Sequence, residues 1–541
     1  MTKIDPVVET DTIAPEPLES AEPQPEISTT DAKRHFLTNT ISNIIYFLFN
    51  IATSFFMVRY QIRHLGIANY GMVTLANSFV SYTQVLTVVL ISTLFRFVML
   101  HIAKGDMKTA RIYFNTQFTA VVWFIVAFLP IAAVVSYCTP FFLRIPPGQN
   151  DNTRILFFLM YVSFLTALLS IPFRLAQYTM QRFDVSNWID MGNQIARYSM
   201  WIVMFALFVP LTWHIGLGFT IGAVVTLCCS ITYARPLMRR LRPSARQFNW
   251  PRFVEMAKTG TWIVVSHIGT LIYLSIDALI INRMLGPTSV GKYCTILSIA
   301  VMLRSLFSTM AGMMTPLAVA SYAREDYAGL GKQMARAVKF VSLGSSLPLA
   351  AVCGLAAPFL TWWLGPQFKV LWPLVWWLLA HLLITSGVEP LHSVKLAANR
   401  MAVPGTMTIL GGILKLVAAI LLVKHTSLGF YGVAIPSALS LVALHTIFTP
   451  IYVGSILKMS SWPFYKALIP SVMVFAGASA GTAYFAMHTN LATFPRLAMS
   501  VVTIFVVCGA VIYFFALNGE DRQFLKGVIR NRGKRQAEAQ A

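Results

Sequence analysis

Six ionisable side chains lie within, or at the edge of, long apolar stretches of the sequence. They are four bases and two acids: Arg96, Arg197, Arg304, Lys415, Asp277 and Glu389. An ionised group at the centre of a bilayer costs roughly 2.5 to 3.5 kcal/mol on insertion scales, so such groups normally face a cavity or a partner of opposite charge. The bases could bind an anionic cargo, and the acids are candidates for ion coupling or gating. The alternative for each residue is an interhelical ion pair or a side chain that reaches the interface.

Polar residues extend several of these positions along one helix face. Residues that follow each other at about 100° per position on a helix share a face, so their types show what that face contacts. Such stripes predict hydrated interior surfaces contributed by both halves of the chain. The four stripes are Arg304 with Ser308 and Thr315; Asp277 with Ser266, Thr270 and Tyr273; Arg96 with Ser78 and Ser92; and Arg197 with Ser186, Asp190, Asn193 and Gln194.

No catalytic constellation accompanies these charges. The sequence contains no H-E-x-x-H, no G-x-S-x-G and no paired acidic motif, and its six cysteines show no metal-ligand spacing. The stretch from Gly286 to Tyr293 differs from the phosphate-binding G-x4-G-K-[ST] loop only in its last position, where the magnesium ligand is lost. An apolar helix rather than a strand precedes this stretch, so it predicts a tight turn. We expect no enzymatic activity, no metal and no cofactor.

The composition identifies the medium in which these residues lie. Of 541 residues, 56% are apolar and 11% are charged, whereas an ordinary soluble protein is about 25% charged. Apolar runs near 20 residues recur almost to the last residue, and about 20 residues of helix cross a bilayer core. The sequence predicts an all-α integral membrane protein with about fourteen transmembrane helices, at 36–58, 72–100, 117–142, 155–175, 191–211, 215–233, 261–281, 293–320, 338–364, 370–388, 404–423, 432–456, 467–487 and 497–517.

The charges predict the orientation and the domains. Basic residues are concentrated at 235–258, at 522–535 and at 104–111, which places these segments and both termini in the cytoplasm. Residues 1–35 hold eight of the 20 acids and five prolines, which is typical of a disordered tail. We expect a tail at 1–35, a six-helix lobe at 36–235, a basic linker at 236–258, a second six-helix lobe at 259–456, two additional helices at 457–517 and a basic tail at 518–541.

A short motif recurs between the first two spans of each predicted lobe. Arg63-His-Leu65-Gly66-x4-Gly71 is repeated 220 residues later as Arg283-Met-Leu285-Gly286-x4-Gly291. An internal repeat of two six-helix bundles explains the recurrence. Since each bundle has an even number of spans, the two would share one orientation in the membrane.

These features together resemble the polysaccharide transporter (oligosaccharide flippase) family of the MOP flippase superfamily. The stretch Leu65-Gly66-Ile-Ala-Asn-Tyr70-Gly71 is similar to that family's N-terminal signature, and the Asp, Leu-Gly and Gly-x-Tyr of residues 277–293 are similar to its central pattern. The resemblance covers residues 36 to about 517. It implies a multi-pass protein of the bacterial plasma membrane that moves a lipid-linked oligosaccharide, held by an undecaprenyl pyrophosphate-type anchor, to the external leaflet. Membrane lipids, and a polymerase and glycosyltransferases of the same pathway, would be its partners, without nucleic acid.

Within that interpretation each intramembrane charge has an expected role. The four bases would meet the charge of the anchor or of acidic sugars, while Asp277 and Glu389 would serve in gating or cation coupling. Two alternatives remain open. A multidrug or cation antiporter of the same superfamily usually has twelve spans and relies on buried acids, whereas this interior carries four bases. A membrane-embedded polymerase or glycosyltransferase generally has a large external loop or acids in the first one, and residues 59–70 contain no acid.

Overall fold

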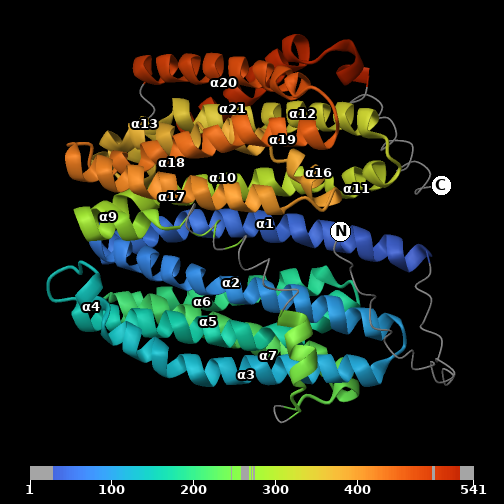
Figure 1. Cartoon of the computed structure of the whole chain (residues 1–541). Helices are drawn as coiled ribbons and strands as arrows, with labels where there is room; N and C mark the ends of the chain where they lie inside the picture. The colour runs from blue at the N-terminus through green and yellow to red at the C-terminus, as the bar shows by residue number, and fades with distance from the viewer. Residues whose placement is uncertain are drawn as a thin grey trace, which may run out of the picture.

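The computed structural model describes residues 29–244, 247–257, 267, 269, 271, 275–489 and 494–523, and within these ranges it is helical without strands (Figure 1). The first half of the chain forms α1 (Thr29–Leu65), α2 (Ile67–Ala103), α3 (Met107–Tyr137), α4 (Thr139–Phe142), α5 (Asn150–Thr179), α6 (Phe183–Leu207) and α7 (Thr212–Leu241). The second half forms α9 (Asp277–Leu285), α10 (Pro287–Gly312), α11 (Thr315–Ala323), α12 (Tyr327–Gly354), α13 (Ala356–Leu364), η1 (Pro366–Leu371), α14 (Trp372–Leu379), α15 (Leu382–Gly387), α16 (Leu391–Ala397), α17 (Ala402–His425), α18 (Tyr431–Ala443), η2 (Leu444–Phe448), α19 (Thr449–Ile456), α20 (Trp462–His488), α21 (Phe494–Val511) and η3 (Ile512–Ala516).

These helices confirm the predicted all-α membrane class. In the described part of the chain, eleven helices are long and apolar enough to cross a bilayer. Helices occupy thirteen of the fourteen predicted spans, and the seventh, 261–281, lies largely outside the described residues. The number fourteen therefore stays a prediction. The first helix begins at Thr29, before the predicted end of the tail at residue 35.

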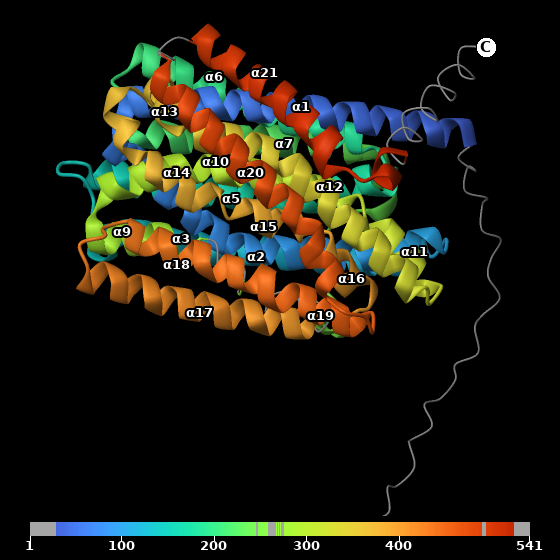
Figure 2. The same ribbon diagram turned by 90° about the horizontal axis from the view of Figure 1, so that it is seen from above.

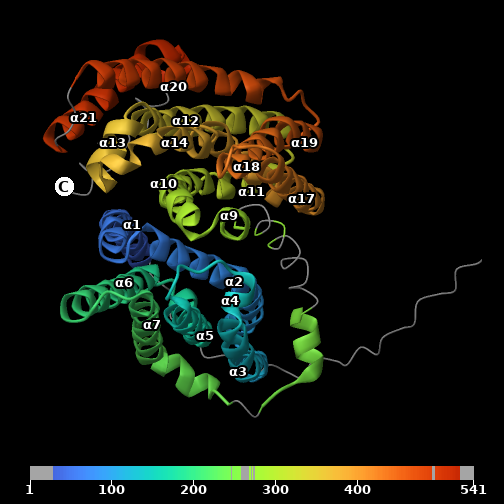
Figure 3. The same ribbon diagram turned by 90° about the vertical axis from the view of Figure 1, so that its left-hand side faces the viewer.

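The helices form two groups that lie side by side. Seen along the bundle, α1–α7 form one group, α9–α19 form the other, and α20 and α21 lie on the outer edge of the second (Figure 3). The start of α1 and the end of the described chain lie at the same end of the bundle (Figures 1 and 2). Much of the outer surface is apolar, with exposed Leu, Ile, Val and Phe side chains along α3, α17, α20 and α21. Such a surface suits lipid rather than water.

The two copies of the repeated motif meet where the groups touch. Gly66 and Gly286 precede α2 and α10 with φ of 77° and 89°, a region that glycine occupies without strain. Gly71 lies against the backbone of Pro287 and Gly291 lies against that of Ile67, so a Cβ on either glycine would collide with a carbonyl oxygen. The repeat therefore builds a close contact of two helix starts across the interface between the groups.

Hydrogen bonds also join the two helix groups at the same end. The side chain of Asn282 accepts a hydrogen bond from the backbone N–H of Arg144 at 2.9 Å and donates one to its carbonyl at 3.0 Å. The Arg144 guanidinium also donates to the carbonyl of Met284 at 3.1 Å. Because Asn282 is fully buried, these bonds satisfy polar groups that water cannot reach. The loop between α4 and α5 is thereby clamped onto α9.

The described part of the basic linker is hydrogen-bonded to α3. Asn115 donates to Gln247 at 2.7 Å, and its amide oxygen accepts the backbone N–H of Ser244 at 3.1 Å. Farther along, Tyr113 donates to Glu255 at 2.7 Å, and Arg252 lies 3.1 Å from the same carboxylate. The Tyr113 hydroxyl first, and then Arg252, hold the pKa of Glu255 below its usual value. The described part of the linker thus belongs to the first helix group.

Candidate functional site

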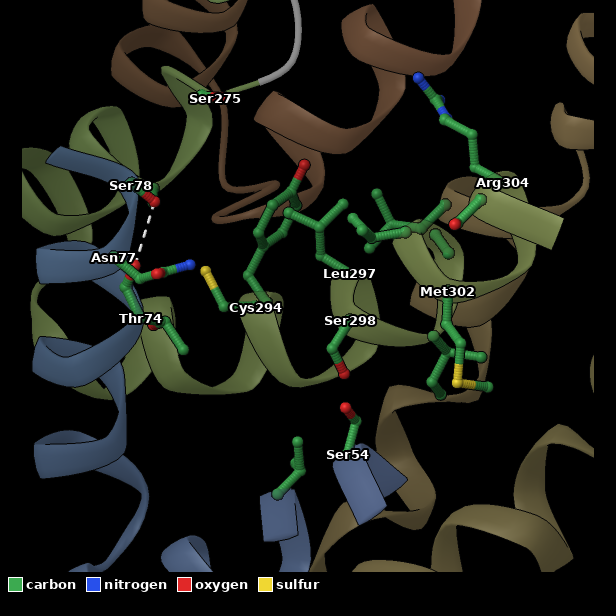
Figure 4. A pocket seen from close by; sticks show the side chains of 18 of the residues that line it. Ser54, Thr74, Asn77, Ser78, Ser275, Cys294, Leu297, Ser298, Met302 and Arg304 are labelled. Carbon is green, nitrogen blue, oxygen red and sulfur yellow. Dashed lines mark hydrogen bonds between the residues drawn. The ribbon is translucent and has the colours of Figure 1, made fainter. Parts of the chain in front are cut away.

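A cavity of about 760 Å³ lies between the two groups of helices. The residues that Figure 4 labels come from α1, α2 and α10, with Ser275 just before α9, and they converge on one space. The first group contributes a wall of hydroxyls, amides and aromatic rings, and the second contributes the charges. The polar lining residues are Tyr46, Asn50, Ser54, Tyr70, Thr74, Asn77, Ser78, Ser81, Ser275, Asp277, Tyr293, Ser298, Arg304, Ser305, His381, Lys415 and Ser437.

A buried carboxylate organises one side of this cavity. Lys415 Nζ lies 2.7 Å from Asp277 Oδ1, and Tyr293 donates its hydroxyl hydrogen to Oδ2 at 2.8 Å. The hydroxyl of Ser437 lies 3.0 Å from Oδ2 and 2.8 Å from the carbonyl of Val433, so its single hydrogen is shared. The four polar side chains, each less than a tenth exposed, come from α9, α10, α17 and α18. One carboxylate thus joins four helices at the cavity wall.

The pattern of α17 explains why Lys415 points inward. Gly412, Lys415 and Ala419 are spaced as one helix face and are buried, whereas Leu414, Leu421 and other large apolar residues are exposed on the opposite face. A helix with a lipid-facing side and one buried ammonium requires a carboxylate opposite, and Asp277 supplies it.

Arg304 is the second base of the cavity. It is half-buried on α10 and lines the cavity wall (Figure 4). His381 also lines the cavity. The ring nitrogen Nδ1 of His381 is buried with no hydrogen-bond partner among the described residues. Since the wall carries two bases and one carboxylate, its formal charge is +1 with His381 neutral.

The structure interrupts the polar face that the sequence predicted around Arg304. The helix α10 ends at Gly312, and α11 starts at Thr315 after a break at residues 313–314. Thr315 is hydrogen-bonded to Ser393 at 2.9 Å, and Ser308 is exposed. The expectation of one continuous stripe was wrong, because helical spacing cannot be extended through a break in the helix.

The other predicted site residues lie away from the cavity wall. Arg96 is exposed on α2, and Glu389 lies in the turn between α15 and α16. Arg197 packs among aromatic rings, with its guanidinium carbon 4.7 Å from the ring centre of Tyr198. The guanidinium also donates to the Tyr198 hydroxyl at 3.0 Å. The structure brings Arg304, Lys415 and Asp277 together and leaves Arg96, Arg197 and Glu389 outside this group.

The remaining predicted stripes divide into two cases. On α6, Asp190 is paired with Arg174, Asn193 donates to Thr226 at 2.9 Å, and Gln194 donates to Tyr46 at 3.3 Å. These side chains therefore join helices instead of forming a hydrated wall. The residues predicted to share a face with Asp277, at 266, 270 and 273, lie outside the described residues, as does the side chain at 92.

Several lining residues were not recognised from the sequence. Tyr293 belongs to the repeated-motif region but was not assigned a role, and Ser437 and His381 carried no signal that distinguished them from other polar residues in spans. The approach of four helices to one carboxylate depends on tertiary packing. A sequence pattern within a single helix contains no information about it.

The chain is similar in sequence to a known protein family and to one curated protein. Residues 36–320 match the family described as "Polysaccharide biosynthesis protein". The chain is 29% identical over 493 residues to the "Uncharacterized membrane protein EpsK" of Bacillus subtilis (strain 168), covering 91% of this chain and 97% of EpsK.

Solved structures share the fold at low sequence identity. The "Lipid II flippase MurJ, inward closed conformation" superimposes with a TM-score of 0.63 at 13% identity, over 88% of this chain and 99% of MurJ. An inward-facing "multidrug resistance MATE family transporter of the MOP superfamily" gives a TM-score of 0.59 at 15% identity, over 75% of this chain and 96% of that transporter. These similarities establish the fold.

Proposed function

Since the chain belongs to the polysaccharide biosynthesis protein family and has the fold of MOP-superfamily membrane transporters, we propose that it is a flippase for a lipid-linked oligosaccharide. The cargo would be carried by an undecaprenyl pyrophosphate-type anchor from the cytoplasmic to the external leaflet of a bacterial plasma membrane. One observation carries the proposal. A cavity with an excess of positive charge lies between two helix groups whose outer surfaces are apolar.

The chemistry of the cavity suits a cargo with an anionic and a sugar part. Arg304 and Lys415 lie on the second group and present cationic donors, which phosphate oxygens accept as short, charge-assisted hydrogen bonds. Asn50, Asn77 and Ser78 on the first group present amides and hydroxyls of the kind that bind sugar hydroxyls. The cavity would therefore receive the headgroup while the hydrocarbon tail stays in the bilayer.

The contacts between the groups support an alternating-access mechanism. The glycine contact of the repeated motif and the Arg144–Asn282 clamp close the molecule at the end that the sequence predicts to be external. In this arrangement the cavity would take cargo from the cytoplasmic side. Opening of the same contacts would then release it outward. Alternation between these two arrangements requires only that the two helix groups rotate relative to one another.

The two alternative functions find less support in the site. A multidrug or cation antiporter needs an available carboxylate for a cationic cargo, and the carboxylate of Asp277 is occupied by Lys415, Tyr293 and Ser437. The excess of base over acid in the cavity would also repel a cation. A polymerase or glycosyltransferase generally has a large external loop or acids in the first external loop, and residues 59–70 contain no acid.

The direct test is transbilayer movement in vesicles that contain only the purified protein. We expect vesicles with the protein to expose a fluorescent pyrophosphate-linked oligosaccharide to an external glycosidase faster than empty vesicles do. A cationic dye serves as the alternative cargo. Transport of the dye without movement of the glycolipid would replace the flippase by the antiporter. Export of surface polysaccharide in a strain without the gene, restored by the intact gene, tests the same function in cells.

A further inference from the structure

The ion pair between Lys415 and Asp277 lies in the wall of the proposed cargo site. Both residues line the cavity, and their charged atoms are 2.7 Å apart. A pair needed only to hold helices together could lie anywhere in the core. Here both charged groups line the cavity that would receive an anionic cargo. The pair is therefore in competition with any anionic cargo.

The surroundings of the pair are unequal. Asp277 keeps two further donors, the hydroxyls of Tyr293 and Ser437, when the ammonium is removed from it. Lys415 lies on α17, whose opposite face carries exposed apolar side chains. The ammonium is also carried on a flexible four-carbon stem. The carboxylate is thus fixed by its neighbours, and the lysine is the partner that can move.

From this inequality we propose that Lys415 is a displaceable cation, which the pyrophosphate of the cargo draws away from Asp277 on binding. The inference rests on the proposed function and adds a role for the carboxylate. Asp277 would hold the ammonium in place in the empty protein and lower the affinity for anions, so that the cargo can leave after it has crossed. Release of cargo would restore the pair.

Linkage fixes the sign of the expected effects. If cargo weakens the pair by some factor, the pair weakens cargo binding by the same factor. Asp277→Asn removes the competing charge but keeps an oxygen for the two hydroxyl donors, so anion binding should become about tenfold tighter, within the usual range of such couplings. Lys415→Gln removes the ligand, so binding should become about tenfold weaker.

The experiment measures binding of farnesyl pyrophosphate to the full chain in nanodiscs, with uncharged farnesol as the reference. Lys424→Gln is the matched control, because Lys424 is an exposed base on the same helix α17. We expect tighter binding for Asp277→Asn, weaker binding for Lys415→Gln, and unchanged binding for the control. Opposite shifts of the first two variants are the signature of competition. A purely structural pair would give shifts of the same direction.

A double variant keeps the test decisive if a single change leaves a buried charge unpaired and prevents folding. Asp277→Asn with Lys415→Gln buries no charge, so it should fold, and it should bind about tenfold more weakly than the wild type. Wild-type affinity in this double variant would overturn the inference, as would equal loss in the Lys424→Gln control. Failure of the wild type to bind the pyrophosphate at all would overturn the proposed anionic cargo together with the inference.

Discussion

At the scale of single residues, the four bases predicted within apolar segments have different surroundings. Lys415 is buried in an ion pair, Arg304 lines the cavity, Arg197 packs among aromatic rings and Arg96 is exposed. Insertion cost alone treats these positions alike. The four positions differ in the residues that surround each base. Arg304 is less buried than Lys415, so its charge is the better placed of the two to act on cargo.

Arg304→Gln should reduce transport while leaving the protein in the membrane. Glutamine keeps hydrogen-bonding capacity but removes the charge that would meet the pyrophosphate, and loss of a charged hydrogen bond corresponds to roughly 1.5 to 3 kcal/mol, or about ten- to hundredfold in affinity. Export of the polysaccharide and the amount of folded protein are measured together. Arg324→Gln, a change at a base that does not line the cavity, is the control. Undiminished transport by Arg304→Gln would assign Arg304 a structural role.

The repeated motif allows a sharp prediction about packing. Gly291→Ala should destabilise the protein, because its Cβ would collide with the carbonyl oxygen of Ile67, which is backbone and cannot rotate away. Overpacking of this kind costs about 1 to 3 kcal/mol. Gly312→Ala at the end of the same helix meets nothing within 4 Å and should be neutral. Thermal unfolding in detergent compares the two, and equal midpoints would show that the helix starts can separate at no cost.

The residue scale also shows what the sequence could not predict. The spacing of Lys415 and Asp277 in apolar stretches indicated that each needed a partner or a cavity, and the structure gives each of them both. Their pairing could not be predicted, because residues 138 positions apart on different helices meet only through tertiary packing. For the same reason the polar residues of α6, predicted to line a hydrated surface, are found in bonds to neighbouring helices.

At the scale of elements, apolar run length predicted helices well but predicted their continuity poorly. The predicted span at 370–388 is a succession of η1, α14 and α15, and the span at 432–456 contains the π-helical turn η2. Proline occurs inside or beside several of these segments, and a missing N–H interrupts the helical hydrogen bonds. A hydropathy average over about 20 residues does not detect such breaks. Breaks change which residues share a face, so they limit the prediction of a site more than the prediction of a fold.

Joining the two groups at the predicted external end should stop transport. Arg144 and Met284 are suitable positions for a cysteine pair, since the Arg144 side chain reaches the Met284 carbonyl across the interface. In a protein whose six native cysteines have been replaced, a short bis-thiol reagent should link these positions and abolish movement of the glycolipid. If flipping continued at full rate in the linked protein, this contact would be a permanent pivot rather than a gate.

The control for that experiment lies within one group. Gln149 and Asn152 are hydrogen-bonded to each other at 2.9 Å near the start of α5, so cysteines there can be linked without joining the groups. Linking them should leave transport intact. The difference between the two pairs isolates relative motion of the helix groups from chemical modification of this end of the molecule. The effect should also be reversed by a cleavable form of the same reagent.

At the scale of the whole molecule, the net charge that crosses the membrane determines the driving force. Lys415 and Asp277 form a neutral pair, and the cavity wall as a whole carries a formal charge of +1 with His381 neutral. In the proposed cycle these charges would stay on the protein and return with it. The charge transferred in one cycle is therefore that of the cargo, and of any ion that accompanies it.

An inside-negative membrane potential should accelerate outward movement of the cargo. A lipid pyrophosphate with about two negative charges gains roughly 4 to 5 kcal/mol on leaving a compartment held at 100 mV inside-negative, since one charge corresponds to about 2.3 kcal/mol. Vesicles with a potassium diffusion potential of either sign, and with proton or sodium gradients imposed separately, distinguish the possible sources of energy. We expect the rate to rise with inside-negative potential and to fall when the sign is reversed. A rate that responds only to a proton or sodium gradient would show that a cation is exchanged for the cargo, and the carboxylate of Asp277 would then be the first group in the cavity to test as its binding site.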